Sequence, residues 1–154
     1  MISKPTTPQL IEAVCAELET KVAPAITEST AQVALAMATA VLRGAAVRSA
    51  NELAWMREEA DAIEQVADDL VGSLPGSEAL AEALEDYRAQ RSDSLYLEDA
   101  LDDYARASEV LSRAVEAAFA DGNPERKAEV EALMTQRMAN ENGVIGVFEA
   151  AGRT

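Results

Sequence analysis

Apolar residues recur at intervals of three and four along most of the chain, the spacing that places side chains on one face of an α-helix. The first such stripe follows Thr7-Pro8, where we expect Thr7 to cap a helix and Pro8 to lie in its first turn. Its members are Leu10, Ile11, Val14, Cys15, Leu18 and Val22. Because Pro24 lacks a backbone N–H, the helix is predicted to end or kink there.

A second helix is predicted from about Thr27–Ser29 toward Val47, and it is apolar on nearly every side. Such a helix belongs in the middle of a bundle or against a second subunit. Residues 49–52, Ser-Ala-Asn-Glu, predict a new helix cap. The third stripe follows as Leu53, Met56, Ala60, Ile63, Ala67 and Leu70.

Proline and glycine divide the rest of the chain. Residues 74–77, Leu-Pro-Gly-Ser, predict a break before a short acidic helix, and residues 91–95 predict a connection. Residues 121–124, Asp-Gly-Asn-Pro, predict the end of one helix and the start of the last. The inward positions of these three helices are predicted as Leu80, Leu84 and Tyr87, then Leu97, Leu101, Tyr104, Leu111, Val115 and Phe119, then Val130, Leu133, Met134 and Met138.

Together these patterns predict a single all-α domain over residues 1–154, a bundle of about six helices with no significant sheet. A chain of this length buries roughly 70% of its unfolded surface, which is enough for one core. We expect residues 1–6 to be disordered. Residues 144–154 are expected to form a frayed or docking tail, because the periodicity weakens around Gly143 and Gly146.

Composition restricts the chemistry, because the chain has no histidine. Without imidazole there is no Ser/His/Asp or Cys/His triad, no histidine metal ligand, and no side chain whose usual pKa lies near neutrality. The glycines form neither a dinucleotide-binding loop nor a phosphate-binding loop. The sequence identifies no catalytic residue and predicts no cofactor, which favours a protein that is not an enzyme.

The net charge of −15 is unevenly distributed. Residues 1–57 hold five acids and five bases, whereas residues 58–104 hold fifteen acids and two arginines, a net charge of −13. No concentrated basic surface exists for nucleic acid. The apolar stretch Ala31–Val47 is judged too short and too weakly hydrophobic to span a bilayer, so no membrane partner is expected. A lone Cys15 and the lack of a signal-like start favour a cytoplasmic location.

Two carboxylate pairs support an alternative, enzymatic interpretation. Glu82 and Glu85 are spaced i, i+3 on one predicted helix, and Asp99 and Asp102 are spaced likewise on the next. Four such acids can bind Mg²⁺ or Mn²⁺, and the pattern resembles in outline that of the all-α nucleotide pyrophosphohydrolases. The resemblance implies a metal-dependent hydrolase of a phosphorylated small molecule, although Asp99 stands where that family has glutamate. A solvated acidic face is the competing and favoured interpretation.

Arg43, Arg48 and Trp55 are the candidate ligand-binding residues. Together with Arg57, the two arginines form the nearest approach to a basic cluster, and they either pair with acids of the middle third or meet an anionic ligand. Trp55 lies beside an apolar stripe, as either the edge of the core or an interface anchor. Cys15 lies within the first stripe and is expected to be a small core residue.

Three short segments carry a further resemblance: Pro8-Gln9-Leu10-Ile11-Glu12-Ala13-Val14, Val22-Ala23-Pro24-Ala25-Ile26 and Val33-Ala34-Leu35-Ala36. They are similar to a family of small bacterial helical proteins of unknown function, encoded beside acyl-CoA dehydrogenase-like and aminoglycoside-phosphotransferase-like enzymes. The likeness covers roughly the first 45 residues and, more faintly, the last 45. It implies an accessory role near acyl-CoA or phosphotransfer chemistry, with an enzyme as a possible partner.

The sequence therefore favours a cytoplasmic helical protein that acts by protein–protein interaction. The apolar second helix predicts self-association, with a homodimer as the simplest homo-oligomer.

Overall fold

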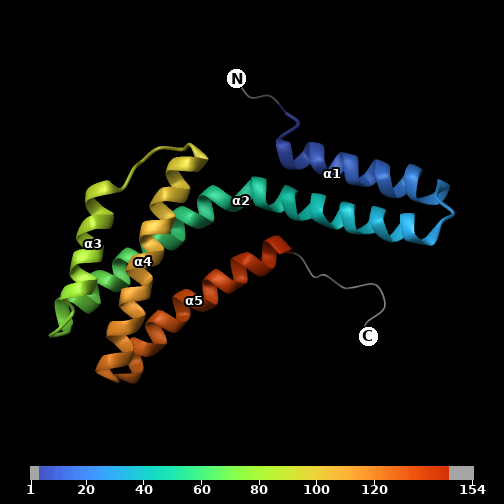
Figure 1. Cartoon of the computed structure of the whole chain (residues 1–154). Helices are drawn as coiled ribbons and strands as arrows, with labels where there is room; N and C mark the ends of the chain where they lie inside the picture. Colours follow the sequence, from blue (N-terminus) through green and yellow to red (C-terminus); the bar gives the residue numbers. More distant parts are fainter. Residues whose placement is uncertain (1–3, 146–154) are drawn as a thin grey trace. The chain divides into compact units, whose positions relative to one another are not determined.

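The computed structural model describes residues 4–145, and every regular element among them is helical (Figure 1). The all-α fold class is therefore confirmed. Within residues 4–145 the five α-helices are α1 (Thr7–Glu17), α2 (Ser29–Ser73), α3 (Glu78–Gln90), α4 (Leu97–Asp121) and α5 (Pro124–Ile145). Two short turns, the π-helical η1 (Leu18–Val22) and the 3₁₀ turn η2 (Ala23–Ala25), join α1 to the loop before α2.

The helices begin and end largely where the capping residues, prolines and glycines of the sequence predict. Thr6, one residue before the predicted cap and within the segment expected to be disordered, is the N-cap of α1, and its N–H donates to Gln9 Oε1 at 2.9 Å. Gly76 and Gly122 have φ values of +86° and +79°, so each supplies the left-handed backbone that its turn requires. Asn123 Oδ1 accepts the N–H of Glu125 at 2.9 Å and caps α5.

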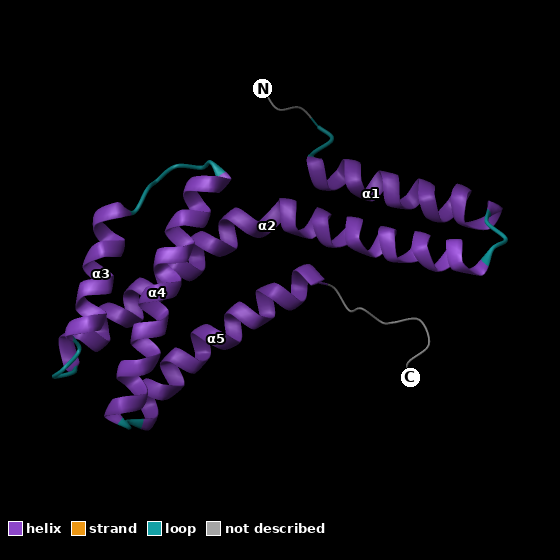
Figure 2. Ribbon diagram, in the orientation of Figure 1, coloured by secondary structure: helices purple, strands orange, loops and turns teal. Residues whose placement is uncertain are grey.

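The prediction of a helix boundary at residues 49–52 is wrong, and α2 runs without interruption for 45 residues (Figure 2). Ser49 Oγ donates to the carbonyl of Ala46 at 3.0 Å, and Asn51 Nδ2 donates to the carbonyl of Val47 at 2.8 Å. Both side chains thus bond one turn back along the helix and do not cap the N–H groups ahead. This continuity reduces the expected six helices to five.

The chain, predicted from its length as one domain, forms two compact units. Unit 1 comprises the chain up to Glu52 together with the segment from Ala139 onward, and unit 2 comprises Leu53–Met138. Residues 1–3, and residues 146–154 of the predicted docking tail, lie outside the described residues. In unit 1, α1 and the first half of α2 form an antiparallel hairpin (Figure 1).

Unit 2 has a core built from four helices, with α3 and α4 packed side by side in opposite directions (Figure 1). The buried residues come from α2 (Ala60, Ile63, Ala67, Leu70), the following turn (Leu74), α3 (Leu80, Leu84, Tyr87), α4 (Ala107, Val110, Leu111, Ala114, Ala118) and α5 (Val130). The three inward positions predicted for α3 are therefore confirmed, as is Val130 in α5. Met134 and Met138 are 48% and 61% exposed and do not belong to this core.

The buried face of α4 differs from the predicted stripe. Its buried residues are mostly small: Ala100, Asp103, Ala107, Val110, Leu111, Ala114 and Ala118. Leu97, Leu101 and Phe119, which were predicted to face inward, are 48%, 45% and 50% exposed. Alanine permits close approach of neighbouring helices, so the tightly packed face of α4 carries the small residues and the longer side chains lie beside it.

Candidate functional site

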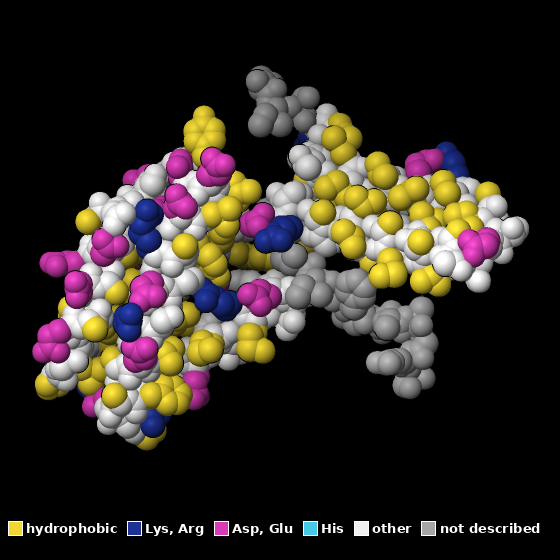
Figure 3. All heavy atoms as spheres, viewed as in Figure 1, with side chains coloured by type: hydrophobic (Ala, Val, Ile, Leu, Met, Phe, Trp, Pro, Cys, Tyr) yellow, Lys and Arg dark blue, Asp and Glu magenta, His cyan; other side chains and the backbone are white. Residues whose placement is uncertain are grey.

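The helical hairpin of unit 1 buries very few of its apolar side chains. Cys15 is fully buried against α2, where its Sγ lies 3.9 Å from the carbonyl oxygen of Thr39, and Thr39 and Ala46 are buried as well. Six large apolar residues remain half exposed: Leu10 (53%), Val14 (51%), Val22 (41%), Val33 (56%), Met37 (54%) and Val41 (63%). We call this set the hairpin face. Figure 3 shows the hydrophobic side chains spread over α1 and the first half of α2.

A single neighbouring helix covers only one side of an apolar helix, so the contact with α1 leaves much of the first half of α2 exposed. In α2 an 18-residue window has a mean hydropathy of 1.4, and only 11% of it is buried. By length and composition this helix is able to cross a membrane, a property shared by the core helices of soluble proteins. The expectation that the stretch Ala31–Val47 is too short and too weakly hydrophobic to span a bilayer is therefore wrong for the helix that contains it.

A groove of about 500 Å³ lies along the hairpin. It is lined by Glu19, Ala23, Gln32, Leu35, Ala36, Thr39, Ala40 and Arg43. Arg43 and Glu19 close one part of it with an ion pair of 2.7 Å between Nη1 and Oε1. The remaining wall is mostly alanine and leucine, so the groove offers apolar contact and one internally neutralised charge pair.

The predicted arginine cluster does not assemble as a ligand site. Arg43 pairs with Glu19 and Glu12 of the hairpin, and Arg48 pairs with Glu52 at 2.6 Å within α2. Both arginines thus pair with acids near them in unit 1, and not with the acidic middle third. Trp55 is half-buried in α2 of unit 2.

Arg57 does pair with the acidic middle third, and its partner is buried. Its Nη1 lies 2.8 Å from Oδ2 of Asp103, a residue of α4 that is 2% exposed. The same guanidinium donates to the carbonyls of Ser92 and Ser94, each at 2.6 Å. Asp103 also accepts the N–H of Ser92 at 3.1 Å. This ion pair therefore fixes the loop between α3 and α4.

A second buried carboxylate, Glu59 of α2, is satisfied by α4 and α5. Arg137 Nε donates to Glu59 Oε1 at 2.5 Å, and the hydroxyl of Tyr104 donates to the same carboxylate at 3.0 Å. The Arg137 guanidinium also lies over the Tyr104 ring, 5.0 Å from its centroid. Burial raises the pKa of Tyr104, Arg137 opposes the rise, and the Glu59 carboxylate adds to it. The network therefore joins three helices of unit 2.

Sequence reasoning missed both buried networks. Asp103 lies three residues after Ala100 and four before Ala107, so it shares the face of α4 that carries the buried alanines. This spacing indicates from the sequence that Asp103 is buried. The long separation between Glu59 and Arg137 leaves no comparable signal, because their meeting depends on how the helices pack.

The four carboxylates of the alternative metal site, Glu82, Glu85, Asp99 and Asp102, are all exposed. Within residues 4–145, no group of three or more acidic or cysteine side chains is placed to hold a metal ion. The structure therefore does not bring the two predicted pairs together.

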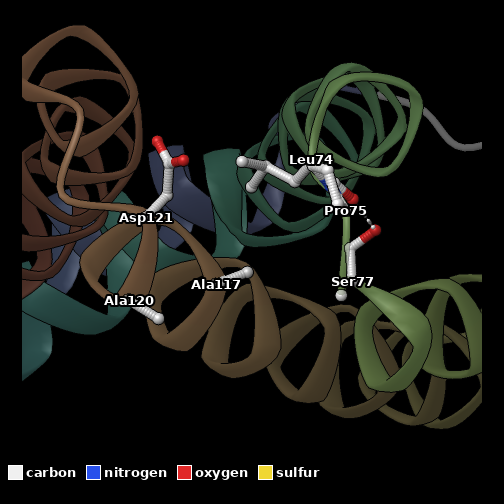
Figure 4. Close-up of a pocket in the computed structure, with 7 residues that line it drawn as sticks. Leu74, Pro75, Ser77, Ala117, Ala120 and Asp121 are labelled. Carbon is white, nitrogen blue, oxygen red and sulfur yellow. Dashed lines mark hydrogen bonds between the residues drawn. The ribbon is translucent and has the colours of Figure 1, made fainter.

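A small cavity of about 190 Å³ lies in unit 2 between the turn after α2 and the end of α4 (Figure 4). Its polar groups are already engaged. The Ser77 hydroxyl donates to the carbonyl of Leu74 at 2.8 Å, and Asp121 pairs with Arg126 at 2.8 Å. The remaining walls are Pro75, Gly76, Ala117 and Ala120, so the cavity presents no free group for binding or catalysis.

No protein-family model matches the chain, and no curated protein or solved structure matches it. The interpretation of function therefore depends on the surfaces described above.

Proposed function

We propose that this chain is a non-enzymatic, cytoplasmic helical protein that acts by protein–protein interaction, and that it self-associates through the hairpin face. The observation that carries this proposal is the half-exposed state of the six large apolar side chains of that face. Several large apolar side chains exposed on one helical hairpin are typical of an interaction site.

The distribution of charge supports self-association through the hairpin rather than through unit 2. Residues 1–57 have equal numbers of acids and bases, so two hairpins approach each other without net repulsion. Residues 58–104 carry −13, and two copies of that surface would repel. A second copy can complete a four-helix arrangement in which each α2 gains the neighbours that it lacks.

The charged side chains of the hairpin support a protein partner over a bilayer. Arg43 with Glu12 and Glu19, and Lys21 with Glu17, place ion pairs beside the apolar positions. A protein interface accommodates such pairs at its rim, whereas the hydrocarbon core of a membrane strongly disfavours them. The resemblance to small bacterial helical proteins supports an accessory or partner role near acyl-CoA or phosphotransfer chemistry.

Sedimentation velocity of the full chain at micromolar concentration tests the proposal. We expect a dimer for the wild type and a monomer for the triple variant Val33→Ser/Met37→Ser/Val41→Ser, whose positions share one face of α2. The matched control is Phe119→Ser/Met134→Ser/Met138→Ser, three comparably exposed apolar residues of unit 2. It is expected to remain dimeric.

A strictly monomeric wild type, or a control variant that dissociates equally, would overturn the proposal. Flotation with neutral phosphatidylcholine vesicles addresses the membrane. A monomer that floats with the vesicles, and loses this in the α2 triple variant, would assign the hairpin face to lipid instead.

A further inference from the structure

The loop between α3 and α4, residues 91–96, displays two large apolar side chains to solvent. Leu95 is 78% exposed and Tyr96 is 80% exposed, the highest values among the large hydrophobic residues that the structure describes. Leu97 and Leu101, at 48% and 45%, extend the apolar surface along the start of α4. We call these four residues the loop patch.

The loop patch is held by hydrogen bonds with partly buried Arg57 and buried Asp103, although its own side chains do not belong to the core of unit 2. Arg57 donates to the carbonyls of Ser92 and Ser94, and Asp103 accepts the N–H of Ser92. The Ser94 hydroxyl accepts the N–H of Tyr96 at 3.2 Å. A preformed loop loses little conformational entropy on binding, and an exposed tyrosine is among the residue types that dominate binding energy at interfaces.

Uncompensated negative charge surrounds the patch. Asp93, Glu98, Asp99 and Asp102 are exposed, and within residues 4–145 none of them pairs with a basic side chain. The nearby Arg91 is engaged by Asp61 and Glu64, at 2.5 and 2.8 Å. Figure 3 shows acidic side chains beside projecting hydrophobic ones where α4 begins. Acids in a first helical turn suit the helix dipole, but that does not account for the apolar side chains between them.

We propose that the loop patch docks a segment of another protein. In that segment, lysine or arginine residues flank apolar side chains. The apolar residues supply the contact, and the acidic rim selects the charge of the partner. The same rim repels nucleic acid, anionic membranes and a second copy of this surface. The inference goes beyond self-association and does not depend on it, because the two surfaces belong to different units.

The test uses the full chain, immobilised, and a phage-displayed library of short random peptides. Clones are counter-selected on the double variant Leu95→Ser/Tyr96→Ser. We expect the recovered peptides to be rich in lysine or arginine together with leucine or aromatic residues. A synthetic copy of a recovered peptide should bind the wild type at least about tenfold more tightly than the double variant.

Two further variants separate docking from diffuse attraction. Phe119→Ser/Met134→Ser removes comparably exposed apolar residues elsewhere in unit 2 and should leave the affinity unchanged. Asp99→Asn/Asp102→Asn keeps the patch, lowers the negative charge of the rim and should weaken binding several-fold at low salt. Circular dichroism verifies that each variant remains helical.

Equal affinity for the wild type and the double variant would overturn the inference, since binding would then reflect only the overall acidity of the chain. Recovery of neutral or acidic peptides would also overturn it. If the double variant instead dissociates the dimer in sedimentation, the patch is a contact between copies and the inference fails, although the self-association proposal stands.

Discussion

Unit 1 and unit 2 are both helical, yet they use their apolar residues in different ways. Unit 2 encloses a core from four helices and also neutralises two buried carboxylates, Asp103 and Glu59, with arginines. The hairpin of unit 1 leaves its large apolar residues half exposed and buries little besides Cys15, Thr39 and Ala46. The most acidic segment thus lies in the unit with a completed core, whereas the neutral segment that forms the hairpin buries few of its apolar side chains. Hydrophobic residues in this chain therefore occupy exposed surface as well as the interior.

The largest expected effect comes from comparing two leucines, one in each unit. Leu70 is 1% exposed in unit 2, and Leu10 is 53% exposed on the hairpin face. We expect Leu70→Ala to lower the free energy of unfolding by about 3 kcal/mol, because it leaves a cavity. Leu10→Ala should change it by less than about 0.5 kcal/mol in the monomer. Denaturant titration at low protein concentration measures both, and equal losses would show that the hairpin is buried within the chain.

A second matched pair tests the buried ion pair of unit 2. Arg57→Met removes the partner of a carboxylate that is almost inaccessible and should lower the free energy of unfolding by about 2 kcal/mol. Arg48→Met breaks an exposed pair with Glu52 and should cost less than about 0.5 kcal/mol. The double variant Arg57→Met/Asp103→Leu should recover part of the loss. Failure to recover would mean that Arg57 acts mainly on the loop carbonyls.

A third comparison sharpens the account of unit 2 alone. The Tyr104 hydroxyl donates to Glu59, so Tyr104→Phe should lower the free energy of unfolding by about 1 kcal/mol. The buried Tyr87 hydroxyl has no hydrogen-bond partner among residues 4–145. Tyr87→Phe should therefore leave stability unchanged or raise it by up to about 1 kcal/mol. Thermal unfolding followed by circular dichroism distinguishes these outcomes, and a clear loss in Tyr87→Phe would indicate a bound water at the hydroxyl.

Local signals in the sequence were sufficient for much of the fold. The breaks at Gly76 and Gly122 and the inward faces of α3 follow from backbone chemistry and spacing, so they were predicted correctly. The predicted cap at residues 49–52 failed because serine and asparagine also bond backward within a helix. In α4 the larger residues were placed inward, whereas close packing favours alanine on the buried face. The continuation of α2 past residue 52 and the buried face of α4 both depend on how neighbouring helices pack. The apolar pattern of one helix carries no information about that packing.

The surfaces were harder to predict than the helices. The apolar character of α2 was visible in the sequence, but helix spacing alone does not show which of its residues α1 covers. The exposure of Leu95 and Tyr96 had no signal, since a connection of this length is compatible with burial or display. The loop that carries them is held by hydrogen bonds with residues distant in sequence, among them Arg57, thirty-five residues before Ser92.

The smallest effect concerns alkaline pH and again separates the core from the surface. Burial raises the pKa of Tyr87, so the folded state holds the neutral phenol to a higher pH than the unfolded chain, in which the pKa is about 10. The contribution to stability is fully present below about pH 10 and is lost as the pH rises through the folded pKa. Unfolding titrations from about pH 8 to about pH 11 should thus show a decline that is shallower in Tyr87→Phe. Tyr96→Phe, which removes a hydroxyl from the exposed loop patch and not from the core, is the matched control variant. An unchanged slope in Tyr87→Phe would mean that water reaches this hydroxyl and that the core of unit 2 is less closed than its packing indicates.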